Sequence, residues 1–344
     1  MRILVVTNAY PTADFPASGT FVEQQVRGLR DIGLEVDVMF VDRVQKGMGA
    51  YLSLGWELGR LLSRQPVDLV HVMYGGVMAD MATLVSHKPT IVSFCGSDLL
   101  GELLSGRVRK FMAGCGVNAS YRSARRANGI VVKSKNLENA LPSDVDRNKV
   151  RIIPNGVDLD LFAPRDRQEC REKLGWAGDH FHVLFPTTCG DPRKRFELAK
   201  AAVEEAERGG LNWEIHQLKS VAHADVPLWL NASDVVLLTS LHEGSPNVIK
   251  EALACNVPIV SVDVGDVSER INGVNGSYIA KANPQDLAGK LRLVVSGERR
   301  TNGRSAMCEL SLRRTAELLH NFYLDTLYSE SRSAVCHRVE TTGR

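Results

Sequence analysis

Short apolar runs alternate with longer amphipathic stretches along nearly the whole chain of 344 residues. The short runs have the length and composition of buried strands, and the longer stretches repeat their apolar positions at helical spacing. Such an alternation predicts an α/β protein built from βαβ units and parallel sheets. The expected strands are Arg2–Thr7, Glu35–Val41, Asp68–Met73, Thr90–Phe94, Gly129–Val132 and Val150–Ile153 in the first half, then His182–Pro186, Trp213–Leu218, Val235–Thr239, Pro258–Val262 and Gly276–Ile279.

The expected helices lie between these strands and after the last of them. Those of the first half are Phe21–Asp31, Tyr51–Ser63 and Leu103–Arg126. Those of the second half are Arg195–Arg208, Val226–Asn231, Pro246–Ala254, Pro284–Val295 and a final pair within Arg300–Tyr328.

A chain of this length exceeds one ordinary core, so we expect two domains. The pattern restarts in the second half, after a segment with turn chemistry and no periodicity at Asn155–Phe162. We place the linker just after it, near Ala163–Gln168, which gives domains of residues 1–165 and 166–311. Residues 329–344 are polar, mixed in charge and without apolar periodicity, so we expect a mobile tail there.

The composition is that of a soluble globular protein, with 44% hydrophobic and 24% charged residues. No apolar run approaches the length of a membrane span, and the first apolar stretch is too short for a signal peptide. Seven cysteines without a C-x-x-C pair favour free thiols in a reducing compartment, so we expect a cytoplasmic protein. Cys336 and His337 lack the further ligands and spacing of a metal site, and we expect no metal.

The segment Glu243–Glu251 places two carboxylates around the start of a short helix, directly after an apolar strand. Ser245 suits the N-cap and Pro246 the first helical position. The unpaired N–H groups and partial positive charge of that helix end favour an anion. Glu251, further along the helix, can accept hydrogen bonds from two adjacent hydroxyls, as on a ribose. The segment therefore fits a nucleotide-sugar; two solvated glutamates on a surface helix are the alternative.

Three consecutive cations, Arg193, Lys194 and Arg195, stand near the start of the helix that follows the first strand of the second half. Cations at that end oppose the helix dipole, so an anionic ligand explains them better than stability does. A diphosphate bound by Lys194, with Arg193 or Arg195 beside it, is one interpretation. A solvated basic turn is the other.

The first half also carries candidates at the expected carboxyl ends of strands, where parallel sheets bind ligands. Gly19 lets a backbone N–H approach a phosphate, or is a plain turn glycine. Asp98, after the strand Thr90–Phe94, contacts an acceptor hydroxyl or caps a helix. His71 is either a core histidine or a cleft residue beside the turn at Tyr74.

Several of these segments resemble the GT-B retaining glycosyltransferases of family 4, the glycosyl transferases group 1. Glu243–Glu251 resembles the E-x7-E motif of that family, Ile153–Asp158 its IPNGVD signature, and the loop through Gly19 its YP…GtF opening. The loop with Lys194 resembles the family's G-R-x(n)-K-G segment, without the arginine in its usual place. Ser93–Asp98 resembles the HG-x-D segment, but Cys95 stands where the family has histidine, and a thiol does not replace an imidazole in proton transfer.

The resemblance implies two Rossmann-like doubly wound domains facing a central cleft, with a last helix near residues 312–328 packing back on the first domain. It implies transfer of a sugar from a nucleotide-diphosphate-sugar to a hydroxyl with retained configuration, and no essential metal. Glu243 then lies beside the donor sugar and Glu251 at the ribose. The implied catalytic residues are Glu243, Asp98 and Lys194; the donor is bound by Gly19, Arg193, Lys194, Ser245, Pro246, Asn247, Val248 and Glu251; and the acceptor side holds Cys95, Asp98 and Tyr74.

The acceptor implied by the family is a glycan, a glycolipid or a lipid-linked sugar of polysaccharide or cell-envelope biosynthesis. The region Arg107–Lys135 contains no Asp or Glu, so contact with an anionic membrane surface is expected as one reading, and a solvated helix face is the other. Few aromatic residues interleave with these cations, which disfavours nucleic acid. A GT-B nucleotide-sugar epimerase and a non-catalytic nucleotide-sugar-binding protein are the alternatives to a transferase; a dinucleotide oxidoreductase is disfavoured because no G-x-G-x-x-G is present.

Overall fold

The computed structural model describes residues 1–15, 18–47, 49–101, 106–187, 190–219, 221–297 and 299–342. The chain forms two compact units. The first consists of Met1–Thr12, Ser18–Pro154 and Arg313–Arg344, and the second of Asn155–Leu312 with the short segment Ala13–Ala17. The division falls between Pro154 and Asn155, ahead of the linker that the sequence analysis placed near Ala163–Gln168.

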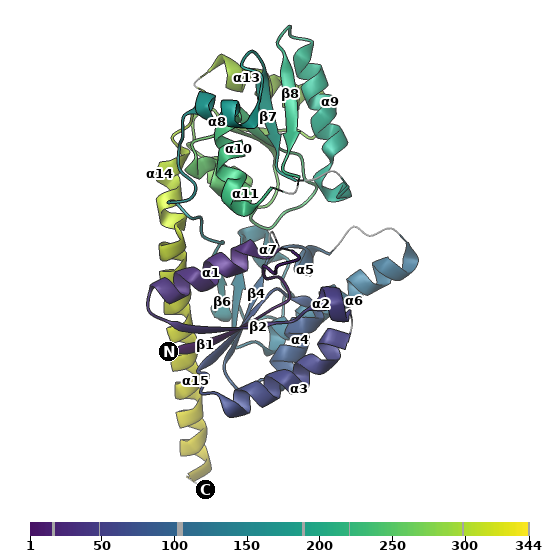
Figure 1. The fold of residues 1–344 in the computed structure, drawn as a ribbon. Helices are drawn as coiled ribbons and strands as arrows, with labels where there is room; N and C mark the ends of the chain where they lie inside the picture. The colour runs from purple at the N-terminus through teal and green to yellow at the C-terminus, as the bar shows by residue number, and fades with distance from the viewer. Residues whose placement is uncertain are drawn as a thin grey trace. The chain divides into compact units, whose positions relative to one another are not determined.

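The first unit is built on a six-stranded parallel sheet in the order β2-β1-β3-β4-β5-β6 (Figure 1). Its strands are β1 Arg2–Thr7, β2 Glu35–Phe40, β3 Leu69–Met73, β4 Thr90–Phe94, β5 Gly129–Val132 and β6 Val150–Ile152. Its helices are α1 Thr20–Asp31, α2 Arg43–Lys46, α3 Gly49–Arg64, α4 Gly76–Val85, α5 Ser97–Leu100, α6 Arg107–Arg126, α7 Lys135–Asn139 and α15 Leu312–Thr342.

Both faces of this sheet are covered, and β1 shows how the sequence achieves it. Successive side chains of a strand point to opposite faces. Leu4 and Val6 pack with α3, α4 and α6, whereas Ile3 and Val5 pack with α1 and α15. The middle of a central strand in a parallel sheet is therefore continuously apolar, and the run Ile3–Val6 made β1 recognisable in the sequence.

The second unit is built on a five-stranded parallel sheet in the order β11-β10-β9-β7-β8. Its strands are β7 Phe181–Phe185, β8 Trp213–Gln217, β9 Val235–Leu238, β10 Ile259–Val262 and β11 Tyr278–Ala280. Its helices are α8 Arg167–Leu174, α9 Phe196–Glu207, α10 Val226–Ala232, α11 Asn247–Ala254, α12 Val267–Ile271, α13 Pro284–Ser296 and α14 Gly303–Met307. A single apolar core joins this sheet to its helices.

The strands expected from the sequence are present, with ends that shift by one or two residues. The two longest helices that were not expected are α4 and α8; the short helices α2, α5, α7 and α12 were not expected either. Helix α4 is apolar almost throughout and shows little amphipathic periodicity. Helix α8, Arg167–Leu174, begins at the end of the expected linker and continues beyond it; Asp166 caps the helix by accepting a hydrogen bond from the Glu169 N–H at 2.9 Å. The start of the expected helix Leu103–Arg126 lies partly outside the described residues, and α6 begins at Arg107.

The last helix, α15, is longer than the sequence analysis expected. It continues to Thr342, beyond the end expected near Tyr328, and the mobility of residues 329–344 stays a prediction. No Gly or Pro interrupts residues 312–342, and a helix anchored at one end extends at little cost per residue. Among the described residues, no helix combines the length and the apolar character that crossing a bilayer requires.

A buried polar chain fastens α15 to the sheet of the first unit. His71 on β3 lies 2.6 Å from Tyr323 Oη through Nδ1 and 2.8 Å from Ser93 Oγ through Nε2. All three side chains are fully buried. Burial, with a smaller effect of the Lys133 charge, lowers the pKa of His71 to about 3, so its ring is neutral. His71 is therefore a core histidine, the first of its two interpretations.

Replacing Tyr323 by phenylalanine is expected to destabilise the first unit. The change deprives buried His71 Nδ1 of its partner, which costs about 1–3 kcal/mol. Tyr328→Phe is the matched control, because Tyr328 on the same helix is 67% exposed; it should change stability by less than about 0.5 kcal/mol. Urea unfolding measures both variants. Equal stability of the two would show that the Tyr323–His71 contact contributes nothing.

Candidate active site

The second unit brings a cation and a carboxylate together at the carboxyl ends of its central strands. Lys194 lies in the 3-10 turn Pro192–Lys194 that follows β7, and Glu243 lies in the loop after β9. Lys194 Nζ is 2.5 Å from Glu243 Oε1. The two side chains are 25% and 16% exposed, so the pair is shielded but open to solvent on one side. Two residues predicted separately thus form one charged group at the ligand-binding edge of the sheet.

The arginines on either side of Lys194 make contacts within the protein. Arg193 forms a two-pronged ion pair with Asp191, at 3.1 Å from Nε and 2.7 Å from Nη2. Arg195 adopts the left-handed conformation, with φ of 50°, and donates to the backbone carbonyls of Thr239 and Ser240 at the end of β9. Arg195 thus connects the loop to the sheet and Arg193 is held by Asp191, and the choice between them as the second phosphate-binding cation stays a prediction.

Helix α11 begins where the E-x7-E segment predicted a helix, but its cap is different. Pro246 is the N-cap, and no described side chain caps the first turn. The Ser245 hydroxyl, expected to cap the helix, lies 2.8 Å from Asp266 Oδ2 and 3.2 Å from Lys250 Nζ. The prediction for Ser245 was wrong because two buried charged groups compete for the same hydroxyl, and such groups need every partner available.

The other residues of this helix start have defined partners. Asn247 Oδ1 accepts a hydrogen bond from Asn155 Nδ2 at 3.2 Å, which ties the IPNGVD segment to α11. Val248 packs at the edge of the apolar core. Glu251 Oε1 lies 3.0 Å from His223 Nε2, and the side chains are 12% and 22% exposed. His223 follows β8 and packs edge-on against Phe162, so the carboxylate of Glu251 is held in a fixed orientation.

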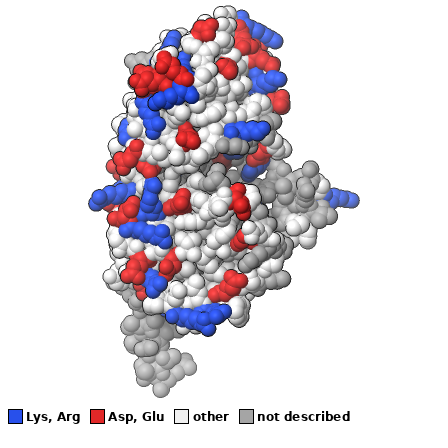
Figure 2. Space-filling model, viewed as in Figure 1, with Lys and Arg blue, Asp and Glu red and all other residues white. Residues whose placement is uncertain are grey.

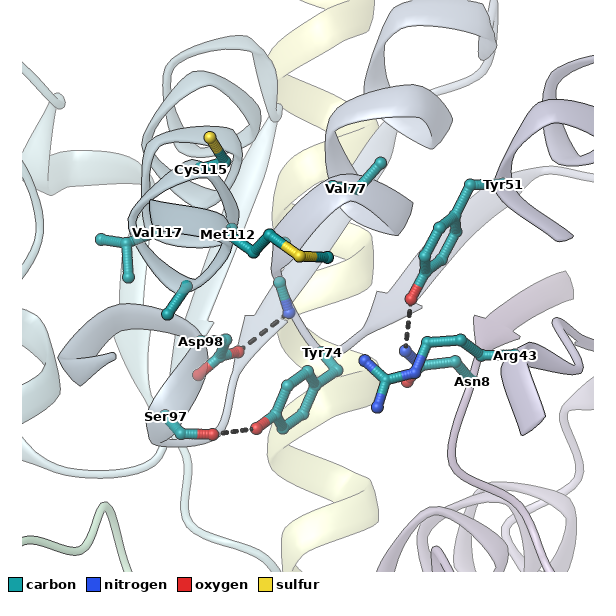
Figure 3. A pocket seen from close by; sticks show the side chains of 14 residues that line it. Asn8, Arg43, Tyr51, Tyr74, Val77, Ser97, Asp98, Met112, Cys115 and Val117 are labelled. Carbon is teal, nitrogen blue, oxygen red and sulfur yellow. Dashed lines mark hydrogen bonds between the residues drawn. The ribbon is translucent and has the colours of Figure 1, made fainter. Parts of the chain in front are cut away.

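The first unit contains a cavity of about 320 Å³ at the carboxyl ends of β1, β3 and β4 (Figure 3). Figure 3 shows Tyr51, Tyr74 and Met112 around it, with hydrogen bonds from Tyr74 to Ser97 and from Asn8 to Tyr51. Its lining combines a few polar groups with a larger apolar surface and comprises Asn8, Arg43, Tyr51, Tyr74, Gly75, Gly76, Val77, Ser97, Asp98, Met112, Ala113, Cys115, Gly116 and Val117.

Tyr74 holds a strained backbone position beside this cavity. Its φ of 94° lies in a region that a bulky residue rarely adopts and that costs of order 1–3 kcal/mol. The Tyr74 hydroxyl lies 2.5 Å from Ser97 Oγ. Such strain persists only where the surroundings impose it, and it is concentrated at functional sites. The acceptor-side prediction for Tyr74 therefore has a cavity and a strained backbone in its favour.

Asp98 organises the loops that line the cavity. Its carboxylate accepts backbone N–H groups from Gly75 at 2.8 Å, Cys95 at 3.0 Å and Gly96 at 2.7 Å. Burial raises the pKa of Asp98, and the backbone hydrogen bonds oppose that rise. The side chain thus joins the turn after β3 to the turn after β4. Cys95, in the position of the family histidine, contributes its backbone N–H to this arrangement and is partly buried.

Gly19 is required by close packing of the chain against itself. It precedes α1 with φ of 67°, and a Cβ at this position would lie 2.1 Å from the carbonyl carbon of Ala9. No real Cβ contact is that short, so a side chain cannot be accommodated without moving the loop after β1. This contact accounts for the glycine, and the approach of its N–H to a phosphate stays a prediction.

Lys133 is a candidate ligand-binding residue that the sequence indicated only as one cation of the basic region Arg107–Lys135. It lies at the carboxyl end of β5, is 1% exposed, and its Nζ has no hydrogen-bond partner among the described residues. Burial lowers the pKa of Lys133, and the neighbouring Cys95 and Asp98 oppose that shift. A lysine directly after an apolar strand was the available signal, because that position is the sheet edge where ligands bind.

Several cations of the basic region Arg107–Lys135 form ion pairs that the sequence of the region did not indicate. Arg122 and Arg126 pair with Asp80 of α4, Arg125 with Asp144, and Lys135 with Glu138. Four cations of the acid-free window are thus paired with acids that lie outside the window. Over the described surface as a whole, Figure 2 shows Lys and Arg interspersed with Asp and Glu on the face in view.

Comparisons with known proteins agree with the motifs. Two family models match the chain, Glycosyltransferase Family 4 over residues 5–161 and Glycosyl transferases group 1 over residues 187–296. TuaC of Bacillus subtilis (strain 168), a glycosyltransferase named for teichuronic acid biosynthesis, is 24% identical over 330 residues, which cover 78% of this chain and 82% of TuaC. The chain spans 41% to 43% of the length of several other curated relatives that it matches.

Solved structures show the same fold. Sucrose-phosphate synthase from Thermosynechococcus elongatus matches with a TM-score of 0.77 at 16% identity, over 95% of this chain and 99% of that one. Anabaena Alr3699/HepE in complex with UDP-glucose matches with a TM-score of 0.65 at 17% identity, over 96% and 100%. The predicted GT-B fold of two Rossmann-like domains is therefore confirmed.

These findings define a glycosyltransferase with the GT-B fold. The chain belongs to the glycosyl transferases group 1, as the resemblance of its motifs predicted.

Replacing Gly19 by alanine is expected to destabilise the first unit more than Gly33→Ala does. Gly33 also has a positive φ, 88°, but a Cβ there meets nothing within 4 Å, so its replacement costs only the backbone penalty of about 1–2 kcal/mol. Gly19→Ala adds the clash with Ala9. Chemical denaturation of both variants measures the difference, and equal losses would show that the loop after β1 yields freely.

Proposed function

We propose that the protein is a retaining glycosyltransferase, which moves a sugar from a nucleotide-diphosphate-sugar to a hydroxyl of a glycan, a glycolipid or a lipid-linked sugar in polysaccharide or cell-envelope biosynthesis. The observation that carries the proposal is the pairing of Lys194 with Glu243 at the carboxyl edge of the second sheet. An ammonium and a carboxylate held there suit a ligand that brings both a phosphate and a sugar.

In the proposed donor complex the diphosphate exchanges for Glu243 as the partner of Lys194. The first-turn N–H groups of α11, at Asn247 and Val248, supply further positive potential. Glu243, released from the ion pair, accepts from hydroxyls of the donor sugar. Glu251, oriented by His223, accepts from the ribose diol. The UDP-glucose bound to Anabaena Alr3699/HepE, which has the same fold, supports a donor of this class.

The chemical step asks mainly for stabilisation of charge. As the bond between sugar and diphosphate breaks, negative charge develops on the departing phosphate, and Lys194 with the α11 N–H groups is positioned to stabilise it. The reaction then needs no activated nucleophile, because the acceptor attacks on the face that the diphosphate leaves and gives its proton to the leaving group. The proposal includes no essential metal, since the diphosphate charge is met by protein groups.

The cavity of the first unit supports an acceptor with an apolar part. Val77, Met112 and Val117 supply apolar surface, whereas Asn8 and Tyr74 supply hydrogen-bonding groups at the sheet edge. A sugar hydroxyl carried on an apolar or lipid aglycone fits that combination. The similarity to TuaC, which is named for teichuronic acid biosynthesis, supports an acceptor in polysaccharide biosynthesis.

Contact with an anionic membrane forms a further part of the proposal. On α6, Phe111 and Met112 are 73% and 54% exposed, and Arg107 is exposed near the start of the same helix. Apolar side chains next to a cation suit the boundary between headgroups and acyl chains. We accordingly propose a protein of the cytoplasm that binds the inner membrane face through this end of α6.

Incubation of the purified chain with a panel of nucleotide-sugars separates the candidate functions. A transferase releases nucleotide only when a suitable acceptor, such as a lipid-linked sugar in anionic liposomes, is added. Isomerised donor without nucleotide release would identify an epimerase, and saturable donor binding without any turnover would identify a binding protein. Analysis of the anomeric linkage in the product tests retention, and an inverted product would overturn it.

Lys194→Ala is expected to lower kcat/KM by about 10²–10³-fold, as loss of one preorganised charge-stabilising donor does. Lys200→Ala is the matched control, because Lys200 lies on the adjacent helix α9 and its side chain is 55% exposed. It should retain full activity.

Glu251→Gln should instead weaken donor binding in calorimetry. Unchanged activity of Lys194→Ala would refute the phosphate assignment, and unchanged donor affinity of Glu251→Gln would refute the ribose assignment.

A further inference from the structure

Three metal-ligating side chains meet at the edge of the second sheet, and none of them belongs to the proposed donor or acceptor site. His182 lies on β7, and Glu214 and His216 lie on the edge strand β8. His182 is the register partner of Glu214. Glu214 and His216 are two residues apart, so their side chains leave the strand on one face. The parallel pairing thus places all three on the same face.

The spacing of the three ligand atoms is that of a metal site. His182 Nδ1 lies 2.8 Å from His216 Nε2, and Glu214 Oε2 lies 3.6 Å and 3.7 Å from these two nitrogens. The point in the plane of the three atoms that is equidistant from them lies about 2.0 Å from each, which matches zinc–nitrogen and zinc–oxygen bonds of about 2.0–2.2 Å. Tetrahedral ligands at such lengths lie about 3.3 Å apart, a value that the three separations bracket.

The rings are held in the orientation that coordination requires. His182 Nε2 lies 2.7 Å from the carbonyl oxygen of Ala177, which can only accept, so Nε2 carries the proton and Nδ1 presents its lone pair to the cluster. Ligating histidines commonly donate their second N–H to a backbone carbonyl in this way. Trp176 stacks on the His216 ring at 3.6 Å between centroids and with 4° between the planes, which fixes the second ring.

The environment keeps both rings neutral and leaves one side open. Burial lowers the pKa of His182, and burial with the nearby His182 and Arg171 lowers the pKa of His216 to about 4. Neutral imidazole is the form that binds metal. The side chains of His182 and His216 are 0% and 11% exposed, but that of Glu214 is 47% exposed. An ion can enter past the glutamate and keep a water molecule there.

We propose that His182 Nδ1, Glu214 Oε2 and His216 Nε2 bind one divalent transition-metal ion, with zinc the best match, and that the ion fastens β8 to β7. A set of two imidazoles and one carboxylate selects such ions over Mg²⁺ or Ca²⁺, which prefer all-oxygen ligands. When the ion binds, it takes the place of the proton between His182 Nδ1 and His216 Nε2, and that proton moves to His216 Nδ1. An edge strand has a partner on only one side, so a clip of this kind stabilises it.

The test uses the full chain, freed of any histidine tag and of metal, without nucleotide. Zinc titrated in a calorimeter should bind once with high affinity, and it should raise the melting temperature by several degrees. Glu214→Gln and His216→Gln should each weaken binding at least 10-fold and remove the thermal shift. Cobalt substitution should give the visible absorption of nitrogen and oxygen coordination, without the near-ultraviolet band that thiolates such as exposed Cys115 or Cys308 produce.

His180→Gln is the matched control, because His180 is two residues from His182 and pairs with Asp179 outside the cluster. It should bind zinc like the unaltered chain. Undiminished binding in Glu214→Gln and His216→Gln would overturn the proposal and leave a hydrogen-bonded pair of neutral histidines. Loss of binding in His180→Gln would overturn the assigned ligands. Donor-dependent activity is a separate readout, since the ligands differ from those assigned to the donor.

Discussion

Burial of both faces of two parallel sheets is the constraint on which the rest of this molecule depends. In a parallel sheet every strand points the same way, so consecutive strands are joined by crossover helices. These helices cover both faces of the sheet. The loops that follow the strands therefore collect at one edge of each sheet. Lys194 and Glu243 meet there although they are far apart in sequence, and Tyr74 and Asp98 meet at the corresponding edge of the first sheet.

The strands and most helices could be predicted because their signals are local. The strand β1 is buried and apolar from Ile3 to Val6, and Pro246 marks the start of α11. Helix α4 was missed because an almost wholly apolar helix has no polar face to reveal its period. The end of α15 was missed for the opposite reason, since a polar sequence without Gly or Pro can extend a helix that is anchored elsewhere.

The candidate site was predictable in residue type and position but not in its internal contacts. The motif indicated Lys194, Glu243 and Glu251, yet neither the Lys194–Glu243 pair nor the Glu251–His223 contact can be read from spacing. Ser245 was assigned to a cap because local rules ignore Asp266, which lies twenty-one residues further along. The pairing of Arg122 with Asp80 and of Arg125 with Asp144 could not be read from the sequence either, because each acid lies in another segment of the chain. In each case the contact is made by charged or polar side chains that come from separate segments of the chain.

The two ends of the chain complete one core, and this has a consequence for biogenesis. Ile3 and Val5 pack with Leu319 and Tyr323 of α15. The sheet of the first unit therefore lacks one of its covering helices until α15 is synthesised. During translation the whole second unit is synthesised before α15 leaves the ribosome. Until then an apolar sheet surface stays open to water, where chaperones bind nascent chains. Premature termination near the carboxyl end therefore destabilises the first unit, although most of that unit is translated first.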